Sequence, residues 1–323
     1  MLHLVPRVLR YVESVAEIGS IQRTSREIGI AASAIDRQIL QLEESLGVQL
    51  FERQAAGMSL TVAGERVVML ARRWHKDSET LVSELKQMQG VDMGVVRVAV
   101  MDSQVNGLLP LCVERIARDY PRIHVEIEVM SPDAAAVALD RGDVDIAMAF
   151  NLRPQRQLHV LWSENLPLGC LVSPGHALAR HRAVTLAEVT RHPLALQSRT
   201  LAIRQKLEKQ FGWLIRDTER TVVTNSLQMV KQLAMRGGHV ALTSEMDAAT
   251  ELLEGRLVFV PIEERLSIGQ SIAIAVSTRR FLTRVARLVA STMCEEAATL
   301  LTAARQASDK TSCRSGGGDA ARK

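Results

Sequence analysis

The first sixty residues contain three runs of apolar side chains at helical spacing, and a glycine follows each run. Spacings of three and four residues predict helices over about 2–18, 21–28 and 32–46. The third helix carries the strongest apolar stripe, on Ile35, Ile39, Leu42 and Leu46. The pattern therefore predicts a small helical domain at the start of the chain.

Two further elements follow these helices. Residues 48–61 hold apolar side chains around Gly57 and indicate a small hairpin. Thr61 is then in position to cap a long helix over about 62–89. Because this helix exceeds what a small domain needs for its own core, we expect it to connect domains or to dimerise.

From residue 95 the pattern changes to short apolar strands that alternate with helices. Strands are expected at 95–100, 125–129 and 144–150, with helices over 108–120 and 132–141. This order is typical of a parallel α/β sheet. The same rhythm then restarts, which indicates two similar α/β lobes with ligand space between them. The later elements are expected as strands at 168–172, 222–223, 239–243, 257–260 and 272–276, and helices at 200–211, 226–236 and 281–301.

Composition fits a multidomain globular protein in the cytoplasm. The chain has 323 residues, of which 47% are hydrophobic and 24% charged. It shows no apolar run of the roughly 18–20 residues that a membrane span needs, and its first residues do not resemble a signal peptide. The cysteines are scattered singly, without metal-ligand spacing, at Cys112, Cys170, Cys294 and Cys313.

Charge alone does not indicate a nucleic-acid-binding protein. The net charge is +4, but residues 305–323 carry +3 of it and residues 1–90 are neutral overall. Any DNA contact must therefore depend on a few well-placed groups. The run SGGGD and the charges around it predict a disordered tail over 305–323.

The second and third predicted helices, joined around residues 29–31, fit a helix-turn-helix. In a DNA major groove, arginine can bind guanine or phosphate, glutamine can read adenine, and leucine can contact a thymine methyl. A helical hairpin that only builds a core is the alternative. Opposite its apolar stripe, the third helix presents Ser33, Asp36, Arg37, Leu40 and Gln41.

The run GSIQRTSREIGIAASAIDRQILQLEESLGVQLFER at 19–53, followed by LTVAGE at 60–65, resembles the winged helix-turn-helix of LysR-type transcriptional regulators. The resemblance extends over about 1–300, because that family adds a linker helix and a two-lobed, periplasmic-binding-protein-like effector domain. It implies a sequence-specific DNA-binding regulator, modulated by a small molecule, that forms a homodimer or homotetramer.

The resemblance also assigns boundaries and DNA contacts. The expected domains are a winged helix-turn-helix at 1–61, a linker helix at 62–92 and an effector domain at 93–304. Within the effector domain, lobe I covers about 93–163 and 268–304, and lobe II about 164–267. The predicted DNA-binding residues are Ser20, Arg23, Ser33, Asp36, Arg37, Leu40, Gln41 and Arg53.

The sequence departs from the family at two places. Thr24 and Ser25 stand where members usually have two alanines, so the second helix packs around larger, polar side chains. Residues 31–33 and Asp36 replace the usual Ser-Gln-Pro and serine at the start of the third helix. Because these are contact positions in the family, we expect a different operator preference.

Candidate effector residues lie at the ends of predicted strands. Asp102, Ser103 and Asn106 follow the first strand, where they can cap the next helix or leave its amides free to hold a carboxylate. Arg199 or Arg204 can counter an anionic effector. With the positions that the resemblance adds, the predicted effector-binding residues are Ser103, Ser131, Phe150, Ser198, Arg199, Thr200, Thr224 and Asn225.

Enzymatic activity is not expected, and neither is a cofactor or metal. The sequence shows no G-x-S-x-G, P-loop or H-E-x-x-H motif, and no G-x-G-x-x-G after the first strand of the α/β region. A two-lobed solute-binding or metabolite-sensing protein without DNA binding is the alternative function. It explains residues 95–300 but leaves the first ninety unexplained.

Overall fold

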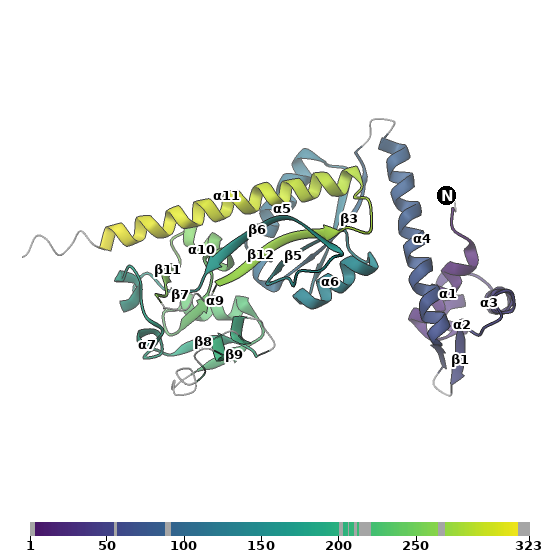
Figure 1. Ribbon diagram of the computed structural model, residues 1–323, viewed down its shortest axis with the longest axis horizontal. Helices are drawn as coiled ribbons and strands as arrows, with labels where there is room; N and C mark the ends of the chain where they lie inside the picture. The colour runs from purple at the N-terminus through teal and green to yellow at the C-terminus, as the bar shows by residue number, and fades with distance from the viewer. Residues whose placement is uncertain are drawn as a thin grey trace, which may run out of the picture. The chain divides into compact units, whose positions relative to one another are not determined.

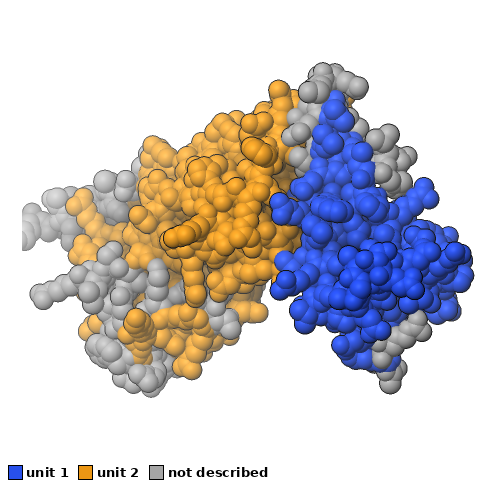
Figure 2. Space-filling model, turned by 45° about the vertical axis from the view of Figure 1, so that its right-hand side comes forward, with its two compact units in different colours: residues 1–91 blue, residues 92–323 orange. Residues whose placement is uncertain are grey.

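The computed structural model describes residues 4–54, 57–87, 92–199, 203–205, 207–209, 212, 221–263 and 269–315. The chain divides into two compact units, Met1–Val91 (unit 1) and Asp92–Lys323 (unit 2), which Figure 2 shows in separate colours. Among the described residues, no helix combines the length and the apolar character that a membrane span requires.

Unit 1 is a three-helix domain with a two-stranded hairpin and a long final helix. Its core joins the first and third helices to the hairpin through buried side chains such as Val12, Val15, Ile35, Ile39 and Leu50. The elements are α1 (Arg7–Ile18), α2 (Ile21–Ile28), α3 (Ala32–Leu46), β1 (Phe51–Gln54), β2 (Gly57–Leu60) and α4 (Val62–Gln87).

The first helix is shorter than the sequence pattern predicts. It begins at Arg7, and Pro6 is its N-cap residue. Proline has no backbone N–H and suits the start of a helix rather than its interior, so the helix cannot run on from residue 2. Residues 2 and 3 of the expected helix lie outside the described part of the chain.

Lobe I of unit 2 is a mixed five-stranded sheet in the order β4-β3-β5-β12-β6. Its first three strands in the chain pair in parallel, whereas β12 runs antiparallel to both of its neighbours. A wholly parallel sheet was the expectation, so the sequence pattern found the strand at 272–276 but not its antiparallel direction. The strands are β3 (Gly94–Val100), β4 (Ile123–Val129), β5 (Ile146–Phe150), β6 (Leu158–Pro167) and β12 (Gly269–Ser277).

Helices cover both faces of this sheet. Alternate strand residues point to opposite faces: Val98 and Met148 join the large core with α5 (Leu108–Asp119), whereas Ala99 and Ala147 pack against α6 (Pro132–Arg141). The final helix, α11 (Arg284–Ser315), contacts α5 and the sheet of lobe I, and it also contacts lobe II (Figure 1).

Lobe II repeats the plan with the strand order β11-β7-β10-β8-β9. Strands β8, β9 and β10 are parallel, while β7 pairs antiparallel with β10 and β11. The strands are β7 (Gly169–Val172), β8 (Leu194–Gln197), β9 (Val222–Thr224), β10 (Val240–Thr243) and β11 (Val258–Pro261). The described helices of lobe II are α7 (Leu186–Val189), α9 (Leu227–Met235) and α10 (Ala249–Leu253), with 3₁₀ turns η2 (Ala177–Arg180) and η3 (Glu245–Ala248). A further 3₁₀ turn, η1 (Asp102–Gln104), follows β3 in lobe I.

Strand β6 was not predicted. It pairs with β12 as far as Pro167, so the lobe boundary expected near residues 163–164 falls inside a strand of lobe I. Most of its side chains are exposed or half-buried, which is why no apolar run marks it in the sequence. The predicted helix at 200–211 lies partly outside the described residues.

The last helix runs beyond its predicted end at residue 301. It continues to Ser315, where the sequence analysis expects a disordered tail from residue 305. Ala304 is fully buried, and the Nε of Arg305 lies 3.0 Å from Oε1 of the buried Glu245 in η3. These contacts anchor the helix past residue 301, so the expectation of disorder is wrong for residues 305–315. Residues 316–323 lie outside the described chain.

Candidate functional site

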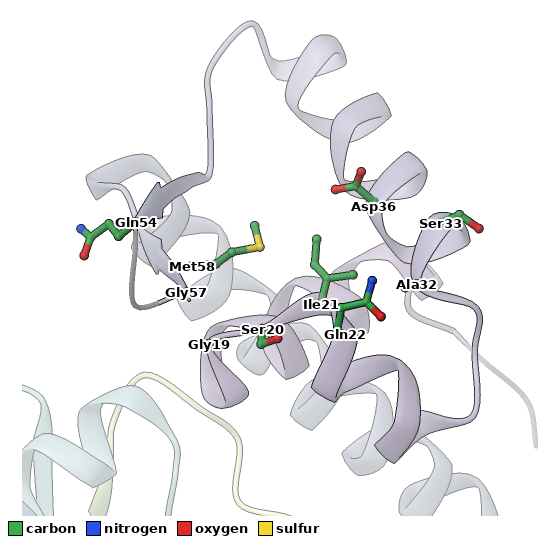
Figure 3. Close-up of a pocket in the computed structure, with 10 residues that line it drawn as sticks. All are labelled: Gly19, Ser20, Ile21, Gln22, Ala32, Ser33, Asp36, Gln54, Gly57 and Met58. Carbon is green, nitrogen blue, oxygen red and sulfur yellow. The ribbon is translucent and has the colours of Figure 1, made fainter.

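Unit 1 has a groove of about 460 Å³ between α2, α3 and the hairpin. Ile21 of α2, Asp36 of α3 and Met58 of β2 converge on it (Figure 3). The other lining residues are Gly19, Ser20, Gln22, Ala32, Ser33, Gln54 and Gly57. Asp36 is the only charged residue among them, so the groove itself is weakly acidic.

The exposed face of α3 begins at this groove. Arg37, Leu40 and Gln41 are exposed, while Ile35 and Ile39 are buried on the opposite side. The helical spacing therefore separates a core face from a free polar face. An α-helix of this kind fits the major groove of DNA.

The predicted DNA-binding residues fall into three groups. Ser20, Ser33 and Asp36 line the groove, and Arg37, Leu40 and Gln41 lie on the exposed face of α3. Arg23 is exposed on α2, and Ser20 caps that helix by accepting from the N–H of Arg23 at 3.4 Å. Arg53 lies in β1, but its side chain is outside the described part.

Two polar lining residues of this groove were not predicted, Gln22 and Gln54. Gln22 directly precedes the predicted Arg23, and Gln54 directly follows Arg53. Both are polar neighbours of predicted contacts, and that position is the signal that could have found them.

A half-buried carboxylate fixes the hairpin against α3. Oε1 of Glu43 accepts hydrogen bonds from the backbone N–H groups of Leu50, at 2.6 Å, and Phe51, at 3.2 Å. Both amides belong to the entry of the hairpin, so the last turn of α3 sets where β1 starts. Charged acceptors form stronger hydrogen bonds than neutral ones.

Two glycines allow the hairpin to pack closely. A Cβ on Gly64, in α4, would lie 2.0 Å from the carbonyl oxygen of Leu50, and one on Gly57 would lie 2.5 Å from that of Gly19. The N–H of Met58 donates to the same Gly19 carbonyl at 2.8 Å. The hairpin is therefore held beside the N-terminus of α2, where the groove forms.

Thr24, which departs from the family pattern, is fully buried in α2. Its hydroxyl donates to the carbonyl oxygen of Ser20 at 2.9 Å. The larger polar side chain is thus accommodated by a bond within its own helix, as often happens for threonine in helices.

Unit 2 contains a cavity of about 510 Å³ lined by residues of both lobes. Several of these residues follow the carboxyl ends of β3, β4, β5, β8 and β10, the place where open α/β sheets bind ligands. The polar lining residues include Asp102, Ser103, Asp133, Asn151, Arg153, Gln197, Asn225, Thr243, Asp247 and Gln270.

Four of the eight predicted effector-binding residues line this cavity: Ser103, Ser131, Phe150 and Asn225. Ser198 and Thr224 are not among the lining residues; the N–H of Ser198 donates to the carbonyl of Thr224 at 2.8 Å. Arg199 is largely exposed and binds Glu208, with Nε 2.9 Å from Oε1. Thr200 lies outside the described residues.

Asp102 links the two lobes instead of capping the helix that follows it. Its Oδ2 accepts from the N–H of Leu227 at 3.0 Å, at the start of α9 in lobe II. Its carbonyl oxygen accepts from Nε2 of Gln228 at 3.1 Å. The carboxylate therefore occupies the N-terminus of α9, where the helix dipole favours negative charge.

Asp247, in η3, is the most buried acid of the cavity lining and was not predicted. Its Oδ2 accepts from Thr243, from Ser244 Oγ at 3.0 Å and from Gln270 Nε2 at 3.4 Å. Burial raises the pKa of its carboxyl group, while hydrogen bonds from Thr243, Ser103 and Ser244 act in the opposite direction. It joins β10, η3 and β12 at one point.

Asn151 directly follows β5 and has a φ of 51°, a left-handed conformation. Asparagine adopts it more readily than most residues because its short side chain can bond locally. Here its Oδ1 accepts from the N–H of Ser271 at 3.3 Å, and its own N–H donates to the carbonyl of Ser271 at 2.7 Å. Such backbone positions often occur at ligand sites.

The two arginines expected to counter an anion share one carboxylate. Oε1 of Glu208 accepts from Nε of Arg199 at 2.9 Å and from Nη2 of Arg204 at 2.8 Å. The Arg199 guanidinium is the main cause that lowers the pKa of Glu208, opposed in part by burial.

The described cysteines do not have the features of nucleophiles. Burial raises the thiol pKa to about 12 for Cys112 and Cys170 and to about 11 for Cys294. Among the described residues, no group of three or more His, Cys, Asp or Glu side chains could hold a metal ion.

Family models match both units. Residues 6–65 match the model described as "Bacterial regulatory helix-turn-helix protein, lysR family". Residues 89–298 match the "LysR substrate binding domain".

Known proteins are similar to this chain over most of its length. The chain is 27% identical over 265 residues to the RuBisCO operon transcriptional regulator of Allochromatium vinosum, covering 81% of this chain and 86% of that one. Full-length OxyR from Pseudomonas aeruginosa has a similar fold, with a TM-score of 0.64 and 16% identity over 92% of this chain and 95% of that one. Full-length CbnR, solved in complex with its target DNA, has a TM-score of 0.60 and 20% identity over 91% and 99%.

Proposed function

The chain belongs to the LysR family of bacterial helix-turn-helix transcriptional regulators. On this premise we propose which residues bind DNA, which helix pairs two copies and which cavity binds the effector. The predicted fold class is confirmed, a winged helix-turn-helix with a linker helix and a two-lobed α/β effector domain. The protein is a DNA-binding regulator whose activity responds to a small molecule. The alternative without DNA binding does not explain the match over residues 6–65.

The exposed face of α3 is the observation that carries our assignment of the DNA-binding surface. Arg37, Leu40 and Gln41 are exposed on a helix whose other side is buried. In this proposal they enter the major groove, while Ser20 and Arg23 at the start of α2 contact phosphates. Ser33 and Asp36 complete the base-reading face, and Arg53 extends it along the wing.

Helix α4 supports pairing of two copies. It exposes apolar side chains that a soluble helix usually buries, namely Met69, Leu70, Trp74, Leu81 and Leu85. One recognition helix reads only a few base pairs, so paired heads are needed to read two half-sites. A homodimer through α4, or a homotetramer built from such dimers, meets that need.

The cavity of unit 2 is the proposed effector site. Its lining comes from both lobes, so a bound ligand stabilises one arrangement of the lobes over another. This shifts the population of subunit arrangements. Different arrangements space the DNA-binding heads differently and bend DNA to different extents. We assign residues 1–61 to DNA binding, 62–92 to the linker and 93–304 to effector binding.

An enzymatic activity is not part of this proposal, since the named relatives are transcriptional regulators. The cytoplasm, where bacterial DNA lies, is the proposed location. The raised thiol pKa values also argue against the described cysteines as nucleophiles.

A footprint tests DNA binding. The purified chain is expected to protect paired half-sites next to its own gene at about 50–100 mM salt. Because residues 1–90 are neutral overall, nonspecific binding is expected to be modest. A chain that protects no DNA under these conditions contradicts the assignment.

The Arg37→Ala substitution tests the recognition face. It should weaken specific binding by about 1–3 kcal/mol. Arg122→Ala is the matched control, since it removes the same charge from an exposed position of unit 2, outside the groove. Equal affinities for Arg37→Ala and the control would remove Arg37 from the recognition surface.

A further inference from the structure

We propose that the effector is a small amine with an apolar body, whose nitrogen donates hydrogen bonds to Asp247 and Gln197. This inference rests on the proposed function of the cavity as the effector site. It replaces the expectation of an anionic effector with a specific chemical class.

Two buried acceptor atoms of the cavity lining lack donors. Asp247 and Gln197 both line the cavity and are 5% and 1% exposed. Oδ1 of Asp247 and Oε1 of Gln197 have no hydrogen-bond partner within the described residues. A buried acceptor without a donor costs about 1–3 kcal/mol. A ligand that supplies N–H groups removes this cost.

The amide orientation of Gln197 is fixed by a second bond. Its Nε2 donates to the carbonyl oxygen of Leu242 at 2.9 Å. Exchange of the two amide atoms would place two acceptors against each other, so the oxygen must be the atom left without a donor. Donation by the ligand is therefore required at this position too.

Positions that would attract an anion are already occupied by acids of the chain. The N-terminus of α9 is capped by Asp102, and the first turn of α6 contains Asp133. Arg199 and Arg204 both bind Glu208, and neither is among the described residues that line the cavity. Nη1 of Arg204 has no partner among the described residues, but it lies outside the lining. Of the charged lining residues, Asp102, Asp133 and Asp247 are acidic and Arg153 is basic. A carboxylate ligand would therefore meet net negative charge.

The other lining residues of the cavity favour a ligand with an apolar part. Met101, Val129, Phe150 and Leu227 line the same cavity. A volume of about 510 Å³ is within the usual range for small-molecule sites. Burial raises the pKa of Asp247, and a cation beside it stabilises the ionised carboxylate in its place.

Three five-carbon probes test this chemistry on the full-length chain. They are n-pentylamine, which is protonated at neutral pH, pentan-1-ol, which donates without charge, and pentanoate, which has no donor. Binding is followed by ligand-observed NMR titration, and all probes share one apolar tail. We expect n-pentylamine to bind at least about tenfold more tightly than pentanoate, because hydrogen bonds to charged groups are the stronger ones.

The substitution Asp247→Asn tests the residue. It should reduce the preference for n-pentylamine to about threefold or less, since an amide cannot pair with the cation. Glu114→Gln is the matched control, an exposed carboxylate of α5 outside the cavity, and should leave the preference unchanged.

Three results would overturn the proposal: pentanoate binding as tightly as n-pentylamine, no amine binding at about 50 mM, or a preference that survives Asp247→Asn. The comparison of probes on the unsubstituted chain stands even if the variant does not fold. A DNA footprint on the same preparation reports the proposed function separately. If the chain protects DNA as expected but binds pentanoate more tightly than n-pentylamine, only the proposal of an amine effector is contradicted.

Discussion

The proposed DNA-binding face of unit 1 and the cavity of unit 2 differ in how their polar groups are exposed to water. The face of α3 keeps Arg37, Leu40 and Gln41 in solvent, where their polar atoms can bind water until DNA arrives. The cavity instead removes Gln197 and Asp247 from water and leaves an oxygen of each without a donor among the residues that the structure describes. The polar groups of the α3 face are solvated by water. The buried acceptors of the cavity instead carry a free-energy cost that a hydrogen-bond donor on a ligand can remove.

Their supporting carboxylates show the same contrast. Glu43 in unit 1 uses one oxygen for two backbone N–H groups, so it locks the hairpin and has a purely structural role. Asp247 in unit 2 collects its donors on Oδ2 and keeps Oδ1 free of hydrogen bonds to described residues. Glu43 is only half-buried, so its second oxygen can bind water, whereas Asp247 is 5% exposed. A fully buried acid with an unbonded oxygen is therefore the better indicator of a ligand site.

The largest effect is expected from breaking a buried ion pair of unit 2. Nζ of Lys231 in α9 lies 2.8 Å from Oε1 of Glu251 in α10, and both side chains are almost fully buried. Lys231→Met leaves Glu251 without its partner, so it should lower the free energy of unfolding of unit 2 by about 3–5 kcal/mol. Hydrogen exchange measured by mass spectrometry should show faster exchange in β8 and β10 and unchanged exchange in α1–α3.

A double variant separates charge from packing at this position. Lys231→Met combined with Glu251→Leu removes both charges, and stability should return to within about 1 kcal/mol of the unsubstituted chain. If the double variant is as unstable as the single one, loss of packing rather than an unpaired charge explains the effect.

The two regions also differ in how far sequence reasoning could reach. The recognition face lies on one continuous helix, so the period of its apolar residues was enough to identify Arg37 and Gln41 as outward. The cavity lining is assembled from the ends of separate strands. Gln197, Asp247 and Gln270 are far apart in the chain, and no local pattern brings them together.

Contacts between charged side chains and their partners were a second limit on what the sequence could predict. The sequence offered Arg199 and Arg204 as partners for an anion. Helical spacing could have paired Arg204 with Glu208, four residues on, but it does not bring Arg199 to the same carboxylate. In the same way, Asp102 looked like the cap of the next helix and instead caps α9 in the other lobe. Electrostatic roles in the cavity depend on tertiary contacts that periodicity does not encode.

The next effect in size is expected at the hairpin of unit 1. Glu43→Gln replaces a charged acceptor of two backbone N–H groups by a neutral one. The free energy of unfolding of unit 1 should fall by about 1–3 kcal/mol, and specific DNA affinity should fall as the wing loosens. Glu44→Gln, on the exposed side of the same helix, is the control. Equal stabilities would show that Glu43 does not hold the hairpin.

A pH titration tests whether the buried carboxyl group of Asp247 makes the stability of unit 2 depend on pH. The pKa of Asp247 is raised in the folded state, so the folded chain holds this proton more tightly than the unfolded chain. Its contribution to stability is complete below the usual carboxyl pKa of 3.8 and is lost as pH rises through the raised value. Around it, Thr243, Ser244, Ser103 and Gln270 do not titrate.

The slope of stability against pH in this window is at most about 1.4 kcal/mol per pH unit for one proton. Urea unfolding of the full chain at several pH values should show this slope for unit 2, and Asp247→Asn should remove it. The neighbouring Glu245 binds Arg305 at 3.0 Å, so Arg305→Lys serves as the control for that pair. An unchanged slope in Asp247→Asn would assign the dependence to another group.

The smallest effect is expected at Thr24, where unit 1 buries a polar group that needs no further partner. Its hydroxyl donates to the carbonyl oxygen of Ser20, which already accepts the N–H of Thr24 at 2.9 Å. Thr24→Val keeps the shape and leaves that carbonyl satisfied, so the free energy of unfolding should change by less than about 0.5 kcal/mol. Urea unfolding and DNA affinity measure both consequences. A loss above about 1.5 kcal/mol would mean that unit 1, like the cavity of unit 2, depends on a buried polar group, and the contrast between the two regions would fail.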